Sequence, residues 1–437
     1  MVTILVKYIE NLRKKLLNKY LIIFLAGIGL LMVYRGPDYI KLWTKFPARQ
    51  AFGRDFRAYQ AGAIAVYTGH QDIVYNIEKF TEWRKTQGNE TMLVYDYPPL
   101  LFIFYSPFVL FSPIQATRIN FCMNHIILFI SIACLSFLGT ANWQSDKKII
   151  FFLMALPLAF LFSPSIDSLY SGQITIILLL LLTFFTILYV KGKQIAAAFM
   201  LALAISLKLI PAGFIIYFLV RRNYRALIAT FLFLFILLFP VIIYTGSINM
   251  YIDYIKLSPK IISYEYFTNQ SLSACINKYF RTTDSGQPLL NSPLTGDIII
   301  WIITAVMFYI TLKPAAEKIY NRERIYLEIN AFILLILICL PRSWPHYHTF
   351  LLLNLFLTYT AIEQELQSKG RYFIIYLLVF FSIGLIDGEV AGSRNDIILR
   401  LYMLKNHLVF YLLSLLWVIS IFIIHKNNGG KKNLPGV

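Results

Sequence analysis

A carboxylate between basic side chains is the first feature of this sequence that could carry out acid–base chemistry. Asp55 lies between Arg54 and Arg57, with apolar residues at helical spacing after it. Positive charge on both sides favours the ionised carboxylate, which could accept a proton from a hydroxyl group. Asp55 could instead cap the N-terminus of this helix, and position alone leaves both interpretations open.

Cationic side chains that could hold an anion such as phosphate occur at two places further along. Lys208 lies in an apolar stretch next to Pro211, where an ammonium group is costly unless it faces a cavity or an anion. A lysine that extends to a membrane interface is the alternative. Arg342 could clamp a phosphate, and the imidazoles of His346 and His348 could donate to one. Two histidines without further ligands nearby are a weak metal signal, so we expect no metal.

Two weaker signals involve an amide and a second carboxylate. Gly172 permits a close backbone approach, and Gln173 after it could hydrogen-bond a polar ligand. Asp96 precedes Tyr97 and Pro98, and Pro98 biases the backbone before it away from helix. We therefore interpret Asp96 as a turn residue, with a second catalytic carboxylate as the alternative.

The composition places these residues in a membrane protein. Of 437 residues, 58% are hydrophobic and 14% are charged, whereas soluble domains have about 45–50% and about 25%. The apolar residues come in runs of roughly 15–25, which is bilayer length. A soluble enzyme, a disordered chain and a disulfide-stapled secreted domain are excluded. The net charge of +18 is expected to lie in short cytoplasmic loops rather than to bind nucleic acid.

Apolar runs between polar breaks predict about twelve membrane-spanning helices. They fall at roughly 20–34, 114–138, 149–163, 173–190, 194–208, 209–220, 224–244, 297–313, 327–340, 347–362, 371–387 and 407–424. The spans 194–208 and 209–220 are short, and we interpret them as one helix broken at Leu209–Pro211, covered by protein or a polar cavity. The proline-interrupted run 99–112 predicts a re-entrant or surface helix. The basic residues before 20–34 predict an uncleaved signal anchor.

The distribution of Lys and Arg predicts the orientation. With the N-terminus inside, their density in the cytoplasmic pieces is about two and a half times that outside. We expect one polytopic domain, 1–437, in the inner (plasma) membrane, with both termini cytoplasmic. The exterior face would carry a first loop, 35–113, with an amphipathic surface helix after Asp55, and a second loop, 245–296. Residues 426–437 are rich in Gly, Asn and Lys and predict a disordered cytoplasmic tail.

Six short motifs in order are similar to those of glycosyltransferase family 87, whose members are integral membrane enzymes of the GT-C class. The motifs are Asp55 with Tyr59 and Gly69, Tyr97–Leu100, Gly172–Gln173, Leu207–Pro211, Asn269–Leu272 and Ser343–His346. There are departures from the family pattern. Thr175 stands where an Asn is frequent, Tyr347 separates the paired histidines, and Lys278 or Arg281 takes the place of a later Arg.

This resemblance implies an all-α integral membrane fold, a GT-C bundle with extracytoplasmic surface helices in the first long loop. It implies inverting transfer of a sugar, most often mannose, from a polyprenyl-phosphate donor to a glycolipid or surface-glycan acceptor in the bilayer, without cofactor or metal. Asp55 would be the general base. The donor phosphate would be bound by Lys208, Arg342, His346 and His348. The sugar or acceptor would be contacted by Tyr59, Tyr97, Gln173, Asn269, Gln270 and Trp344.

Two other classes stay open at this point. A transporter or flippase for a lipid-linked or anionic substrate would suit a broken helix with a lysine and an exterior Arg/His mouth, although the sequence has no internal repeat. A glycan polymerase or ligase also has many spans and a large exterior loop. That class usually relies on Arg and His in large loops, so the aspartate of the first loop, Asp55, favours the transferase.

Overall fold

The structure is a computed structural model that describes residues 2–44, 52–87, 95–139, 144–258, 268–282, 287–317, 319, 321–386 and 406–427. The side chains at 2–18, 364, 367 and 427 are not described. Within the described ranges the chain forms helices joined by turns, without a strand. Of the predicted cytoplasmic tail, residues 428–437 lie outside the described residues.

Helices make up each part of the chain. Those of the first half are α1 (Val2–Thr44), α2 (Arg54–Tyr67), α3 (Ile77–Thr86), α4 (Leu100–Tyr105), α5 (Pro113–Cys134), α6 (Ser145–Leu161), α7 (Ser163–Ser171), α8 (Thr175–Val190), α9 (Gln194–Leu207) and α10 (Phe214–Val220). Those of the second half are α11 (Tyr224–Ile236), α12 (Phe239–Thr245), α13 (Asn249–Leu257), α14 (Leu272–Phe280), α15 (Pro293–Ala316), α16 (Arg322–Cys339), α17 (Leu351–Ile362), α18 (Leu366–Ile386) and α20 (Leu408–Asn427). The short helices are η2 (Ser106–Leu110), η3 (Leu135–Gly139), η4 (Ile210–Gly213), η6 (Pro345–Phe350) and η7 (Glu363–Glu365).

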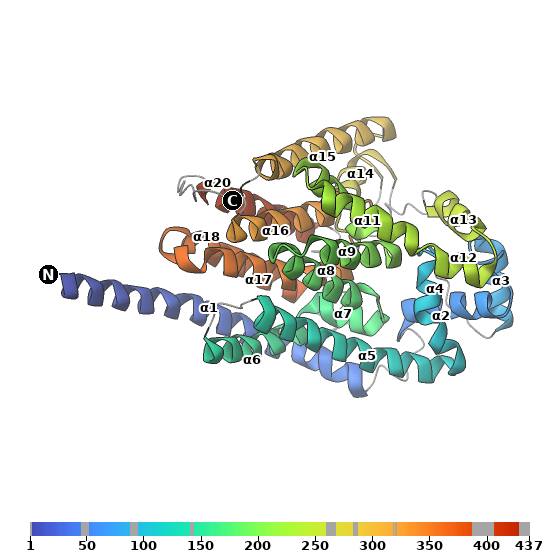
Figure 1. The fold of residues 1–437 in the computed structure, drawn as a ribbon, viewed down its shortest axis with the longest axis horizontal. Helices are drawn as coiled ribbons and strands as arrows, with labels where there is room; N and C mark the ends of the chain where they lie inside the picture. Colours follow the sequence, from blue (N-terminus) through green and yellow to red (C-terminus); the bar gives the residue numbers. More distant parts are fainter. Residues whose placement is uncertain are drawn as a thin grey trace.

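The long helices run along one axis of the molecule (Figure 1). The N-terminal end of α1 projects from one end of the bundle, whereas α2, α3, α4, α12 and α13 gather at the opposite end. That opposite end therefore combines parts of the two long loops that the sequence predicts on the exterior face.

Candidate membrane spans are present along most of the described chain. Six helices are long and apolar enough to cross a bilayer: Lys19–Thr44, Pro113–Phe137, Tyr224–Thr245, Pro293–Ala316, Ser368–Ile386 and Leu408–Lys426. A seventh results if α6 and α7, bent by 60° at Phe162, count as one span. Shorter apolar helices are Leu100–Leu110, Thr175–Val190, Gln194–Leu207 and Ile210–Val220. The all-α integral membrane fold is confirmed, and the number of twelve spans stays a prediction.

Helix α1 continues beyond the end predicted for the first span. The prediction ended this span at residue 34 because polar residues follow. These residues stay helical because their charges pair along the helix: Asp38 lies 2.9 Å from Arg35 and 3.0 Å from Lys41. Arg35 also donates to the carbonyl of Leu385 in α18. The predicted end of the first span, at residue 34, was therefore wrong, because the helix continues to Thr44.

Helix α2 is the helix predicted after Asp55, and protein encloses most of it. Ten of its 14 residues are buried against neighbours that include α4, η2 and α5. Gln60 donates to the carbonyls of Phe108 and Phe111, each at 3.0 Å. These bonds satisfy carbonyls at the end of η2, and they fix α2 against the proline-interrupted segment that follows α4.

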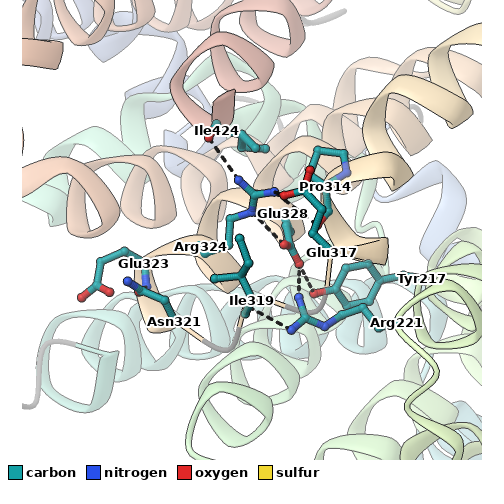
Figure 2. Close-up of polar contacts among 10 residues, drawn as sticks. All are labelled: Tyr217, Arg221, Pro314, Glu317, Ile319, Asn321, Glu323, Arg324, Glu328 and Ile424. Carbon is teal, nitrogen blue, oxygen red and sulfur yellow. Dashed lines mark hydrogen bonds and ion pairs between the residues drawn. The ribbon is translucent and has the colours of Figure 1, made fainter. Parts of the chain in front are cut away.

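A buried network of charges joins four helices (Figure 2). Arg221 in α10 pairs with Glu328 in α16, and Arg324 lies 3.0 Å from the other oxygen of the same carboxylate. Arg324 also pairs with Glu317 after α15, at 3.0 Å, and donates to the carbonyl of Ile424 in α20. The network lies near the start of α16, whose other end leads into the candidate site.

Candidate active site

Two glycines bring the start of α2 against the turn after α7. Gly172 has a φ of +71°, and a Cβ there would lie 2.7 Å from the Cβ of Phe56. Gly53 has a φ of +67°, and its N–H donates to a backbone carbonyl of α7 at 2.8 Å. Only glycine permits both the left-handed backbone and the close approach. As a result, Asp55 in the first turn of α2 lies beside Gln173.

Asp55 is a buried carboxylate at the centre of this contact. It is 6% exposed, and Gln173 donates from Nε2 to its Oδ2 at 2.7 Å. The Nε atom of Arg54 lies 4.0 Å from the same oxygen. Because α2 begins at Arg54, after Gly53, Asp55 is inside the first turn. The alternative that Asp55 caps the helix was therefore wrong.

The environment of Asp55 alters its acidity. Burial raises the pKa of the Asp55 carboxyl above its usual range and is the largest influence. The charges of Arg54, His346 and Lys208, together with the hydrogen bond from Gln173, oppose this rise without outweighing it. We expected the flanking arginines to dominate, and they do not. A carboxylate with a raised pKa is a better base toward a hydroxyl group than an ordinary aspartate.

The amide of Gln173 links this carboxylate to a cation. Its Oε1 accepts a hydrogen bond from the hydroxyl of Tyr59 at 2.8 Å and another from Nζ of Lys208 at 3.2 Å. With two donors on the oxygen and the carboxylate of Asp55 on the nitrogen, all three bonds agree on one amide orientation. The predicted base and one predicted phosphate-binding cation thus belong to one hydrogen-bonded unit.

Lys208 lies at the predicted helix break, beneath two aromatic rings. Helix α9 ends at Leu207, Lys208 has an extended backbone, and η4 begins at Ile210. The Nζ atom lies 5.0 Å from the ring centre of Tyr97 and 4.5 Å from that of Tyr347. Lys208 is buried, so the alternative of a lysine reaching an open interface was wrong. Tyr347, which the sequence showed only as an interruption between histidines, belongs to the site.

Arg342 is held by the second carboxylate, Asp96. Their closest atoms, Nη1 and Oδ2, are 2.6 Å apart. The pair joins the turn before α4 to the turn after α16, and both side chains keep some exposure, 26% for Arg342 and 15% for Asp96. Asp96 is therefore a turn residue with a charged partner. Arg342 is accessible to a second anion, which would share the guanidinium with Asp96.

His346 faces a carboxylate that the sequence analysis missed. Its Nδ1 lies 3.6 Å from Oδ2 of Asp167 in α7, and its Nε2 is buried with no hydrogen-bond partner among the described residues. Burial, and after it the positive charge of Lys208, lower the pKa of His346 well below its usual value, while Asp55 opposes the shift. Asp167 is the only acidic residue in the predicted exterior piece 164–172. A single acidic residue in a segment with no other charged residue was the signal that could have found it.

Other predicted residues hold the turn after α16. Asn269 accepts the backbone N–H of Ser343 at 2.8 Å, and His348 lies 3.0 Å from the hydroxyl of Ser343. Gln270 accepts a backbone N–H of α20 at 3.4 Å. The side chains of Asn269, Gln270 and His348 are fully buried, whereas the adjacent Trp344 is half-buried. Contact of these residues with a sugar, an acceptor or a phosphate stays a prediction.

The arrangement combines a buried base with cationic groups. Among the residues that the structure describes, no three His, Cys, Asp or Glu side chains come together as metal ligands. The predicted residues that do come together are Asp55, Tyr59, Tyr97, Gln173, Lys208 and His346. Such a cluster can take a proton from a hydroxyl group and hold an anionic group beside it.

Comparison with known proteins gives the family. The model described as glycosyltransferase family 87 matches residues 95–341, more than half of the chain. Over 275 residues the chain is 23% identical to the polyprenol-phosphate-mannose-dependent alpha-(1-2)-phosphatidylinositol mannoside mannosyltransferase of Mycobacterium tuberculosis. That match spans 60% of this chain and 60% of the length of the relative. With its several membrane-length apolar helices the chain is a multi-pass membrane protein, and it belongs to glycosyltransferase family 87.

Proposed function

We propose that this protein transfers a sugar, with mannose as the first candidate, from a polyprenyl-phosphate donor to a glycolipid or surface-glycan acceptor, with inversion at the anomeric carbon. One observation carries the proposal: the buried carboxylate of Asp55 is linked through the amide of Gln173 to the ammonium of Lys208. A base and an anion-binding group are therefore adjacent. The name of the mycobacterial relative supports a lipid-linked mannose donor and a glycolipid acceptor.

The proposed reaction has one proton transfer and one leaving group. Asp55 takes the proton from the acceptor hydroxyl as its oxygen attacks the anomeric carbon. The bond between that carbon and the phosphate oxygen breaks, and its electron pair stays on the phosphate, which gains a second negative charge. Phosphate is already a fair leaving group, so the task of the protein is to position the reactants and to stabilise this growing charge.

Three side chains are the candidates for holding the phosphate. Lys208 is already part of the unit with Asp55, and Arg342 is partly exposed beside Asp96. His346 offers a buried Nε2 without a partner among the described residues. We rank His348 below these, because the hydroxyl of Ser343 occupies its Nε2.

Aromatic rings offer a surface for the sugar. Tyr59 and Tyr97 are packed edge to face, with ring centres 4.7 Å apart, next to the base and the cation. Rings of this kind can pack against the apolar face of a sugar while their hydroxyls hydrogen-bond. We assign Tyr59, Tyr97 and Gln173 to sugar or acceptor contact. Trp344, half-buried at the edge of the turn, is a further candidate, and Asn269 and Gln270 support that turn.

We assign the reaction to the extracytoplasmic face of the inner membrane. Gln173 precedes α8, and the basic turn Lys191–Lys193 follows it at the other end. Lys208 likewise precedes α10, and Arg221–Arg222 follow that helix. Basic turns are retained on the cytoplasmic side, which supports an exterior position for the end with Asp55.

Turnover of a defined donor tests the proposal. The protein would be reconstituted in nanodiscs with polyprenyl-phosphate-mannose, with and without a membrane-lipid extract as acceptor source. We expect free polyprenyl phosphate to be released only when acceptor is present, and nanodiscs without protein to release none. Absence of release with mannose and with other sugar donors, arabinofuranose included, would contradict the proposal and favour a transporter or flippase. Formation of long glycan products would favour a polymerase.

A further inference from the structure

The contact between α7 and η6 pairs the imidazole of His346 with the carboxylate of Asp167, to which the proposed reaction gives no role. Oδ2 of Asp167 and Nδ1 of His346 are 3.6 Å apart, and the side chains are 2% and 8% exposed. Nε2, on the far side of the imidazole ring, is buried and has no hydrogen-bond partner among the described residues. A polar ring atom buried in this way is costly unless a ligand reaches it.

Charged groups from several elements act on this imidazole. They are Asp167 from α7, Asp55 and Arg54 from α2, Lys208 from the break after α9, and His348 from η6. Burial and the charge of Lys208 lower the pKa of His346, so the ring is neutral around neutral pH in the absence of a further anion. An anion at Nε2 would reverse this balance, because it favours the protonated ring.

We propose that Asp167 is a positioning residue for donor binding. It orients His346 through Nδ1 and directs Nε2 toward the donor phosphate. Its negative charge also stabilises the imidazolium that forms when His346 takes up a proton as that phosphate binds. This inference rests on the proposed function and adds a coupling between donor binding and protonation. The proton comes from solvent, and no bond of the donor changes in this step. The product of the step is an imidazolium ion between the carboxylate and the phosphate.

The coupling has a definite sign. The pKa of His346 is low without the phosphate and higher in the complex, so between these two values binding takes up one proton. In this window affinity falls as pH rises, by up to about tenfold per pH unit. An opposite charge within about 4–6 Å is worth about 1–3 pKa units. Removing the charge of Asp167 should therefore abolish most of the slope and weaken binding at acidic pH about tenfold or more.

A matched control separates charge from packing. Ser168, the neighbour of Asp167, joins the same two elements: its hydroxyl donates to the carbonyl of His346 at 3.2 Å and lies 2.9 Å from Oγ1 of Thr349. Ser168→Ala removes this contact between α7 and η6 and leaves the charge of Asp167 in place. If Asp167 acts only through packing, the two substitutions should have similar effects.

The experiment measures binding of a polyprenyl methyl phosphate, a diester whose single negative charge does not change between about pH 5 and 8. Wild type, Asp167→Asn, Asp167→Glu, His346→Gln and Ser168→Ala would be compared as full-length protein in nanodiscs. We expect the affinity for the diester to fall as pH rises in the wild type, in Ser168→Ala and in the charge-conserving Asp167→Glu. We expect a nearly flat profile in Asp167→Asn and His346→Gln.

Every other outcome contradicts either this inference or the proposed function. A wild-type pH profile in Asp167→Asn would overturn the inference and leave the donor class intact. A profile lost in Ser168→Ala as well would assign the effect to packing and overturn the inference in the same way. Failure of the wild type to bind the diester at any pH would overturn the proposed function, and this inference with it. If Asp167→Asn does not fold, a flat profile in Asp167→Glu overturns the inference.

Discussion

At Gln173, one amide serves both halves of the proposed reaction. Its nitrogen donates to the carboxylate of Asp55, and its oxygen accepts from Lys208 and Tyr59. The two charged groups are buried, so each depends on such a neutral partner for part of its stabilisation. The amide also fixes the distance between the base and the cation.

Substitution of Gln173 by Leu should lower kcat/KM about 10²- to 10⁴-fold. Hydrogen bonds to charged groups are worth about 1.5–3 kcal/mol, and here two are lost. Tyr59→Phe is the matched control, because it removes only the hydroxyl that donates to the same amide oxygen, and its loss should be less than about tenfold. Steady-state release of polyprenyl phosphate measures both. Equal rates in Gln173→Leu and wild type would show that the amide does not support the reaction.

The raised pKa of Asp55 predicts the acid limb of the pH–rate profile. The base works when ionised, so kcat/KM should fall as pH drops through a value above the usual Asp value of about 4. Arg54→Gln should move this limb to still higher pH, because Arg54 lowers the pKa of Asp55. A limb at or below about 4, or one unmoved by Arg54→Gln, would contradict this assignment.

The sequence predicted some of these residues and not others, for physical reasons. Asp55, Gln173 and Lys208 stand out because polar groups next to long apolar runs are costly without a function. Asp167 and Tyr347 did not, because their roles depend on contacts between segments far apart in the chain.

The type of a side chain alone does not show whether an amide binds a sugar or holds the protein backbone. Asn269 has the amide expected of a sugar ligand, but in the structure its amide holds the backbone of Ser343. The same donor and acceptor atoms suit either task. The hydrogen bond to Ser343 depends on the packing of the turn after α16, which the sequence does not show.

At the scale of elements, α16 connects the charge network with the candidate site. It has 18 residues and so is about 27 Å long. Glu328 lies near its start between two guanidinium groups, and Arg342 and His346 follow its end. The network in Figure 2 therefore holds in place the helix after which Arg342 and His346, two of the predicted phosphate-binding residues, follow.

Removal of the Glu328 carboxylate should destabilise the protein strongly. Glu328→Ala leaves Arg221 and Arg324 buried without the anion they share, and breaking such a buried pair costs about 3–5 kcal/mol. Glu323→Gln, on the first turn of the same helix and half-buried, is the control and should change little. Thermal unfolding in nanodiscs measures both. Equal melting temperatures for Glu328→Ala and Glu323→Gln would show that the network contributes little.

Helix boundaries show what the sequence could predict at this scale. The break at Lys208 was predicted because Pro211 cannot continue a helix without loss of a hydrogen bond. The continuation of α1 to Thr44 was not, because Arg35, Asp38 and Lys41 look like loop residues in a hydropathy plot. Their mutual pairing and the contact of Arg35 with α18 keep them helical.

At the scale of the whole molecule, the two ends of the bundle differ in character. One end gathers α2, α3, α4, α12 and α13, and the N-terminal end of α1 projects from the other (Figure 1). The all-helical membrane fold was predictable because long apolar runs have few alternatives. The number of spans was not, because short apolar helices such as Gln194–Leu207 can end inside the bundle where protein covers their ends.

The proposed orientation predicts a labelling pattern. Asp72, in the exposed turn between α2 and α3, should be extracytoplasmic, and Lys193, in the exposed turn before α9, cytoplasmic. In a variant with its four native cysteines replaced, a membrane-impermeant maleimide should label Asp72→Cys in intact spheroplasts. It should label Lys193→Cys only after permeabilisation. The reverse pattern would move the reaction to the cytoplasmic face.

Replacement of Asp55 tests the central claim most directly. Asp55→Asn keeps the size of the side chain and removes its charge, with Asp72→Asn, an exposed carboxylate, as control. In nanodiscs with polyprenyl-phosphate-mannose and acceptor extract, we predict that Asp55→Asn still binds the donor and loses about 10²- to 10⁴-fold in turnover, while Asp72→Asn matches the wild type. Turnover of Asp55→Asn at the wild-type rate would contradict the account, because the base would then be another residue.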